Sequence, residues 1–139
     1  MTIPYLEAVQ QPGQTVNALF ASLGVLIDHI DQDKAVLRLP PNPATIQGAG
    51  IVAGGVLATM LDEAMAHAAI ARAGVDQGRK VATTNLEVRF FRPARPGDEI
   101  TATGRVVKAG GRVQFLEAEA VNQTGQALAR ATATFLVMD

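Results

Sequence analysis

The chain has 139 residues, of which 48% are hydrophobic, and its formal net charge at pH 7 is −1. This length suffices for one domain with its own core, and the balanced charge, without a basic stripe, argues against a nucleic-acid partner. The chain contains no cysteine, which excludes disulfide bonds and thiol chemistry, and its two histidines are too few for the usual zinc sites.

The N-terminal stretch MTIPYLEAVQQPGQ has no basic region followed by an apolar run, so it does not resemble a secretory signal. Together with the lack of cysteine, this leads us to expect a cytoplasmic protein. Residues 15–23 predict a short helix that ends at Gly24. Residues 25–30 and 34–39 predict two strands joined by a polar turn, and a proline-rich loop then reaches Ala53.

Residues 54–73 form the most apolar stretch of the chain and predict one helix of about five turns. Apolar residues occur on all its sides, which is typical of a helix buried in a protein core or in a membrane. Asp62 and Glu63 stand at its middle, where a carboxylate in lipid is costly, so we expect no membrane span and no membrane partner. We therefore predict a core helix that carries one or both acids inside.

The predicted helix starts with Gly54 and Gly55 after Ala53, so no side chain is available to cap its first N–H groups. Two glycines also let another group approach the backbone closely. Free N–H groups at the positive end of a helix dipole suit an anion or a developing oxyanion. Loop water bound to these N–H groups is the alternative.

Four strand-like runs follow the helix, at residues 82–91, 99–108, 112–122 and 127–137. The connectors between them contain glycine, as hairpin turns do, and lie at 95–97, 109–111 and 122–125. We therefore predict hairpins and antiparallel order. One long helix with about six antiparallel strands indicates an α+β fold, in which the sheet curls round the helix within a single domain that spans residues 1–139.

Three features together resemble a known family. They are the glycine pair at the start of the helix, an acid eight residues after the first glycine in Met60-Leu61-Asp62, and the later run FFRPARPGD. These features resemble hotdog-fold thioesterases, specifically the PaaI-like branch of acyl-CoA thioesterases, over roughly residues 24–137. The resemblance implies the hotdog fold. The chain departs from the family motif at Ala53, where the family has a histidine that is thought to help hold the start of the helix.

The resemblance implies that four residues act in the hydrolysis of an acyl-CoA thioester. Asp62 takes the position of the catalytic carboxylate, as nucleophile or as general base on water, and the Gly54 N–H that of the oxyanion donor. Gln47 falls where the family has an Asn or Gln that orients water or the thioester, and Thr83 where some members carry a Ser or Thr. Coenzyme A enters as part of the substrate, and we expect no cofactor and no metal.

Gly54 and Asp62 are eight residues apart in one predicted helix, roughly 12 Å along its axis, so both cannot touch one carbonyl from the same chain. Two chains with their helices side by side and antiparallel would bring one Gly54 near the other Asp62. We therefore expect a homodimer with a shared active site. The family's dimers have this arrangement, and the resemblance implies Gln47 and Gly54 from one chain and Asp62 and Thr83 from the other. Pairing of dimers into a homotetramer stays open.

A further set of residues is expected to bind the substrate, namely Gly55, Met65, Arg92, Lys108 and Arg112. Met65, like Phe90, belongs either to the core or to the lining of an acyl pocket. The basic residues, with Arg89 and Arg95, stand at predicted strand ends and turns, where they can meet the phosphates of coenzyme A. Arg92 is favoured because it stands in the family-like RPA run.

Two other functions stay open. A hotdog protein that binds acyl-CoA without turnover would keep the fold and the glycine pair, and the missing family histidine favours this alternative. A hydratase or dehydratase would need a histidine and an acid that converge on the substrate. Glu63 and His67 share a helix face but match no such motif, so an (i, i+4) pair or plain packing explains them. The only serine, Ser22, stands outside any G-x-S-x-G, which excludes a serine-hydrolase elbow.

Overall fold

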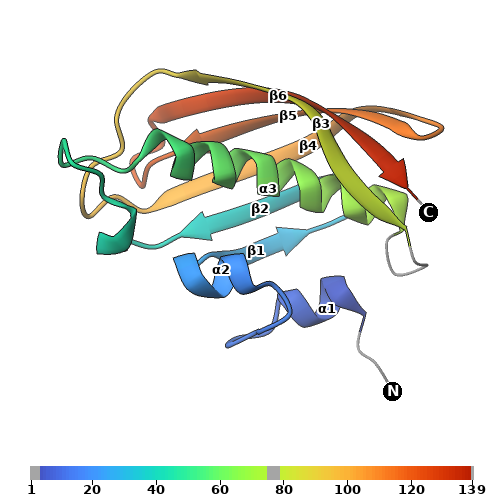
Figure 1. Ribbon diagram of the computed structural model, residues 1–139, viewed down its shortest axis with the longest axis horizontal. Helices are drawn as coiled ribbons and strands as arrows, with labels where there is room; N and C mark the ends of the chain where they lie inside the picture. Colours follow the sequence, from blue (N-terminus) through green and yellow to red (C-terminus); the bar gives the residue numbers. More distant parts are fainter. Residues whose placement is uncertain (1–3, 75–78, 139) are drawn as a thin grey trace.

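The computed structural model of the protein describes residues 4–74 and 79–138. Within these residues, one long helix, α3 (Gly54–Ala73), lies across a six-stranded antiparallel sheet (Figure 1). The strands are β1 (Leu26–Ile30), β2 (Lys34–Leu39), β3 (Lys80–Phe90), β4 (Ile100–Gly110), β5 (Val113–Val121) and β6 (Ala127–Met138). The shorter helical elements are α1 (Tyr5–Val9), α2 (Ala18–Leu23) and the 3₁₀ turn η1 (Pro43–Thr45). The predicted hotdog architecture, a curled antiparallel sheet around a central helix, is confirmed.

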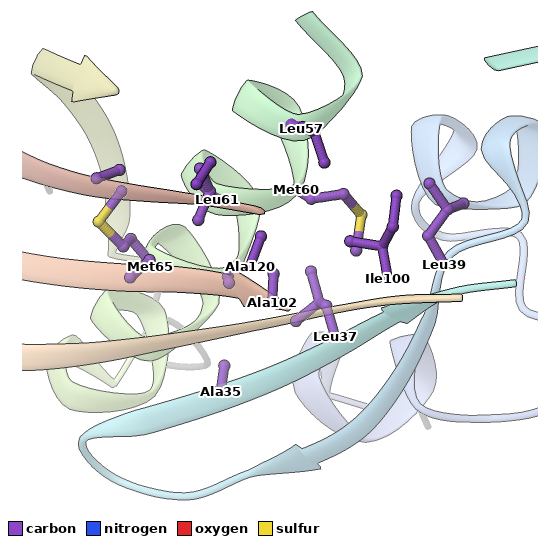
Figure 2. Packing of buried hydrophobic residues seen from close by; sticks show 14 of the residues in the cluster. Ala35, Leu37, Leu39, Leu57, Met60, Leu61, Met65, Ile100, Ala102 and Ala120 are labelled. Carbon is purple, nitrogen blue, oxygen red and sulfur yellow. The ribbon is translucent and has the colours of Figure 1, made fainter. Parts of the chain in front are cut away.

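The central helix begins and ends at the predicted residues. Its C-cap, Gly74, has a φ of 74°, in the left-handed region where glycine ends helices with least strain. Figure 2 shows the side of α3 that packs against the sheet, where Met60 and Met65 are fully buried. The side that carries Asp62 and Ala66 is only half-buried. The expectation of a helix buried all round is therefore wrong for one chain by itself.

The order of strands across the sheet is β1-β2-β4-β5-β6-β3. β3 pairs with β6 and forms an edge of the sheet, so it is not the neighbour of β4. The hairpin predicted at 95–97 is therefore wrong, because residues 91–99 cross from the edge strand to a strand inside the sheet. The hairpins predicted at 109–111 and 122–125 are confirmed by the β4–β5 and β5–β6 pairs.

The middle of α3 touches the backbone of β4 at Gly104. A Cβ atom at Gly104 would lie 2.5 Å from the carbonyl carbon of Ala64 and 2.6 Å from the backbone nitrogen of Met65. No side chain fits such a gap, so glycine is what permits this approach of strand and helix. The contact holds α3 against the sheet next to the two acids at its middle.

A chain of hydrogen bonds joins the N-terminal helices to α3. Asn17 caps α2 by accepting from the Phe20 N–H, and its side-chain amide donates to the Tyr5 hydroxyl over 2.9 Å. The Tyr5 hydroxyl lies 2.9 Å from Nε2 of His67, and Nδ1 of His67 lies 2.8 Å from the carbonyl oxygen of Glu63. A neutral His67 that carries its proton on Nδ1 satisfies every bond of this chain. The sequence did not predict α1, whose position depends on this contact.

Candidate functional site

Asp62 lies on the half-buried side of α3 and faces the edge strand β3. The Thr83 hydroxyl donates a hydrogen bond of 2.7 Å to Oδ1 of Asp62. Thr83 stands where the register of β3 against β6 shifts, between Thr83 and Asn85, and such bulges re-aim the side chains beside them. Because Thr83 is exposed and Asp62 is half-buried, the pair lies where a substrate can reach it. The structure thus brings these two candidate residues together within one chain.

The start of α3 carries unpaired N–H groups. Gly54 and Gly55 are exposed, and among the described residues neither N–H has a hydrogen-bond acceptor. The Ala53 side chain provides no cap, and the Ala53 carbonyl instead accepts from Val56 and Leu57, over 2.9 and 3.3 Å. Two free donors at the positive end of a helix are able to polarise a carbonyl oxygen.

An aromatic ring of β3 lies beside these donors. A Cβ atom placed on Gly54 would lie 3.6 Å from Cε1 and Cζ of Phe90, an ordinary van der Waals contact. Phe90 is 52% exposed, and Leu86, on the same inward face of β3, is 38% exposed. Of the two roles that the sequence left open for Phe90, the structure therefore favours an apolar wall next to the helix start over a place in the core.

Gln47 lies in the loop that leads to α3. Its side-chain oxygen accepts from the Ala49 N–H, and its backbone N–H donates to the Ile51 carbonyl over 2.9 Å. The Ala53 N–H donates to the Thr45 carbonyl, also over 2.9 Å, which ties this loop to the start of the helix. Within one chain, Gln47 makes no hydrogen bond to Asp62, so the structure does not bring these two candidates together.

Met65 and the basic candidates do not converge in one chain. Met65 has no exposed surface, so it belongs to the core rather than to an open pocket. The Arg92 N–H donates to Leu128 at the start of β6, whereas the Arg112 carbonyl accepts from Val137 near the end of β6. These β6 residues are nine positions apart, or roughly 30 Å along a strand. Lys108 lies in β4 near the Arg112 end, so the predicted phosphate-binding set is divided between opposite ends of the sheet.

The comparisons with known proteins identify the family. The family model described as the Thioesterase superfamily matches residues 49–129, which is more than half of the chain and includes both glycines and Asp62. The chain belongs to the thioesterase superfamily. The prediction of a thioester hydrolase is therefore confirmed at the level of the family.

Named relatives refine this membership in the thioesterase superfamily. The medium/long-chain acyl-CoA thioesterase YigI of Escherichia coli is 29% identical over 129 residues, which cover 84% of this chain and 83% of the relative. The acyl-coenzyme A thioesterase PaaI of Escherichia coli is 28% identical over 113 residues, which cover 81% and 77%. The solved structure of Escherichia coli PaaI matches with a TM-score of 0.82 and 25% identity, and the match covers 89% of this chain and 86% of that chain. The resemblance to the PaaI-like branch is thus confirmed.

In this member of the thioesterase superfamily, a second acid lies next to Asp62. Burial, and then the negative charge of Asp62, raise the pKa of Glu63 to about 7. Glu63 turns toward His67, and its Oε2 lies 3.7 Å from Nδ1 of that residue, which confirms the expected (i, i+4) pair. His67 is 1% exposed, and burial lowers its pKa. Because Tyr5 and Phe20 enclose the imidazole, it is closed to a substrate, which argues against a hydratase.

Across residues 4–74 and 79–138, no three His, Asp or Glu side chains lie close enough together to hold a metal ion. None of the helices in that part of the chain is both long and apolar enough to cross a membrane.

Sequence reasoning missed Tyr5, whose hydroxyl contacts His67 on α3. The two residues are 62 positions apart in the sequence, so no local pattern predicts this contact.

Proposed function

We propose that the protein is an acyl-CoA thioesterase whose active site is shared between two copies of the chain. The hydrogen bond between Thr83 and Asp62 carries this proposal, because it holds a carboxylate in a fixed orientation on the open side of α3. The unpaired N–H groups at Gly54 and Gly55 supply the complementary electrophilic element. The substrate class follows from the relatives YigI and PaaI, which are named as acyl-CoA thioesterases.

In the proposed reaction, the Gly54 N–H polarises the thioester carbonyl and Asp62 of the other copy acts on its carbon. Asp62 either takes a proton from water, whose oxygen then bonds to the carbonyl carbon, or attacks the carbon directly, which gives an anhydride that water then hydrolyses to the free acid and the Asp62 carboxylate. The C–S bond breaks, and coenzyme A leaves as a thiolate that takes up a proton. Because a thiolate leaves readily, no separate general acid is required. Thr83 binds Oδ1 of Asp62 and thereby leaves Oδ2 for the reaction.

Two features support the binding of a second copy of the chain at the edge of the sheet formed by β3. β3 is an edge strand, so its outward N–H and C=O groups are available to pair with another strand. The exposed Leu86 and Phe90 and the half-buried side of α3 lie at the same edge, where a partner would cover them. A symmetric pair with antiparallel helices would place Gln47 and Gly54 of one copy opposite Asp62 of the other. The proposed enzyme is a homodimer of the cytoplasm.

Release of coenzyme A from a panel of acyl-CoAs tests the proposal with wild type and Asp62→Asn. We expect turnover by wild type and a loss of about a hundredfold or more in the variant, since the carboxylate acts on the reacting atoms. Asp28→Asn is the matched control, because Asp28 is an exposed acid of β1 that pairs with Arg38. A wild-type protein that binds acyl-CoA without releasing coenzyme A would overturn the proposal in favour of a non-catalytic binding module.

A further inference from the structure

A polar hollow lies at the end of the molecule where α3 begins. It has a volume of about 430 Å³ and lies between residues 92–98, which lead from β3 to β4, and residues 122–126, the turn between β5 and β6. Figure 1 shows both segments at the same end of the sheet as the first turn of α3. The hollow is thus placed beside the proposed active site.

The side-chain oxygens of Asp98, Gln123 and Asn122, which line the hollow, already accept hydrogen bonds from its walls. Oδ2 of Asp98 accepts from the Arg95 N–H over 2.8 Å, and Oδ1 accepts from the Gln123 side-chain amide over 3.0 Å. The side-chain carbonyl oxygen of Gln123 accepts from the Glu99 N–H over 3.0 Å. Asn122 holds its own turn together through three hydrogen bonds to Oδ1. These hydrogen bonds fix the walls of the hollow.

The donors that line the hollow are free, by contrast. Within residues 4–74 and 79–138, the guanidinium groups of Arg92 and Arg95 have no ion-pair or hydrogen-bond partner. Other arginines do pair, as Arg38 does with Asp28 and Arg130 with Glu119. The hollow is thus lined by two unpaired guanidinium groups and by one carboxylate, that of Asp98. Such a site favours an anion with several acceptor oxygens, for which the planar guanidinium is well suited.

Backbone contacts join the hollow to the start of α3. Ala94, which lies between the two arginines, accepts from the Val52 N–H over 2.9 Å, two residues before Gly54. Phe90, two residues before Arg92, lies against Gly54 itself. A substrate whose carbonyl binds the Gly54 N–H thus has the arginines close by.

We propose that this hollow binds the phosphate groups of the nucleotide part of coenzyme A through Arg92 and Arg95. The inference rests on the proposed function and narrows it: the enzyme selects thioesters that carry the nucleotide over those that end at pantetheine. Of the basic residues considered from the sequence, Arg92 keeps its expected role and Arg95 joins it. Lys108 and Arg112 are not needed for this contact.

The test compares the hydrolysis of one acyl-CoA with that of the matching acyl-pantetheine, which has no phosphate. In the double variant Arg92→Ala/Arg95→Ala, we expect kcat/KM for acyl-CoA to fall by about tenfold or more, chiefly through KM, because charge-assisted contacts are lost. For acyl-pantetheine we expect the same kcat/KM as wild type. Arg105→Ala removes an exposed arginine of β4 outside the hollow and should leave both values unchanged.

An equal loss on both substrates would overturn the inference, because the arginines would then act on the fold or on the chemistry. Unchanged hydrolysis of acyl-CoA by the double variant would overturn it as well. A wild-type protein that hydrolyses neither thioester would instead refute the proposed function. Calorimetric titration with adenosine 3′,5′-bisphosphate tests the hollow independently: we expect binding to wild type and none to the double variant, and equal binding to both proteins would contradict the assignment.

Discussion

The hydroxyl of Thr83 donates to Oδ1 of Asp62 over 2.7 Å, from an edge strand to the central helix. The donor stands at a shift in the register of β3, so the strand contributes to the orientation of a carboxylate that the helix carries. Because only one oxygen is held in this way, the other oxygen is left to react. The proposed chemistry therefore depends on a contact between two elements, and each element can be varied separately.

Replacing Thr83 by valine removes this contact with little change of shape. We expect kcat for acyl-CoA hydrolysis to fall about tenfold, because a hydrogen bond to a charged group is lost. Thr83→Ser keeps the hydroxyl and should retain most of the activity. The neighbouring Thr84 donates to the Thr134 carbonyl instead, so Thr84→Val is the control. Equal rates in wild type and Thr83→Val would show that Asp62 needs no such partner.

The contact of β4 with α3 predicts a large loss of stability for Gly104→Ala. The added methyl group would lie 2.5 Å from the Ala64 carbonyl carbon, and backbone atoms cannot move aside cheaply. We expect the free energy of unfolding in urea to fall by about 1–3 kcal/mol. Gly110 of the same strand has no atom within 4 Å of such a methyl group, and Gly110→Ala should change stability by about 0.5 kcal/mol at most. Similar values for the two variants would contradict the close approach.

The raised pKa of Glu63 predicts a pH-dependent loss of stability. Its pKa is about 7 in the folded protein against an ordinary value of 4.5, so the folded state binds this proton more tightly than the unfolded chain does. This contribution to stability is fully present below pH 4.5 and is lost as the pH rises through 7, by at most about 3 kcal/mol. Glu63→Gln should remove this contribution, which urea unfolding of wild type and variant at pH 5 and pH 8 measures.

His67 acts with the opposite sign and therefore has to be separated from Glu63. Burial lowers the pKa of His67, so its contribution to stability is present above the unfolded value of about 6.5 and is lost as the pH falls. The difference in unfolding free energy between wild type and Glu63→Gln largely cancels this contribution at each pH. The unfolding free energy of wild type should therefore fall relative to that of Glu63→Gln between pH 5 and pH 8. A constant difference would show that Glu63 titrates normally.

The central helix was predictable to the residue because local signals mark both of its ends, a glycine pair at Gly54 and a left-handed glycine at Gly74. The position of β3 was not predictable in the same way. The residues at 95–97 have turn chemistry that serves a hairpin or a crossover equally well, and the pairing of β3 with β6 depends on contacts distant in the sequence. α1 was missed for the same reason, since the contact of Tyr5 with His67 stabilises it.

The candidate site was partly accessible from the sequence. The family resemblance suggested Asp62 and Thr83, and the structure places them in contact, while their catalytic roles stay predictions. The burial of Met65 could not be foreseen, because a helix that is apolar on all sides gives no signal of which side faces the sheet. The separation of Arg92 from Arg112 likewise follows from the strand order and not from local sequence.

Two single variants separate the halves of the proposed shared site. Gly54→Pro removes the N–H donor yet suits the backbone, because Ala53 has φ −59° and ψ 136° and proline is favoured at the first position of a helix. Gly54→Ala keeps the N–H and is its control, since the new methyl group meets Phe90 at an ordinary 3.6 Å. Asp62→Asn removes the carboxylate. We expect Gly54→Pro and Asp62→Asn each to be nearly inactive alone.

Co-expression of Gly54→Pro and Asp62→Asn in equal amounts tests the shared site most directly. Half of the resulting dimers should carry one chain of each kind, and one of their two sites then combines an intact donor with an intact carboxylate. We therefore predict recovery of about a quarter of the wild-type rate per chain in the thioester-release assay. A mixture as inactive as the two variants alone would contradict an active site built from two chains.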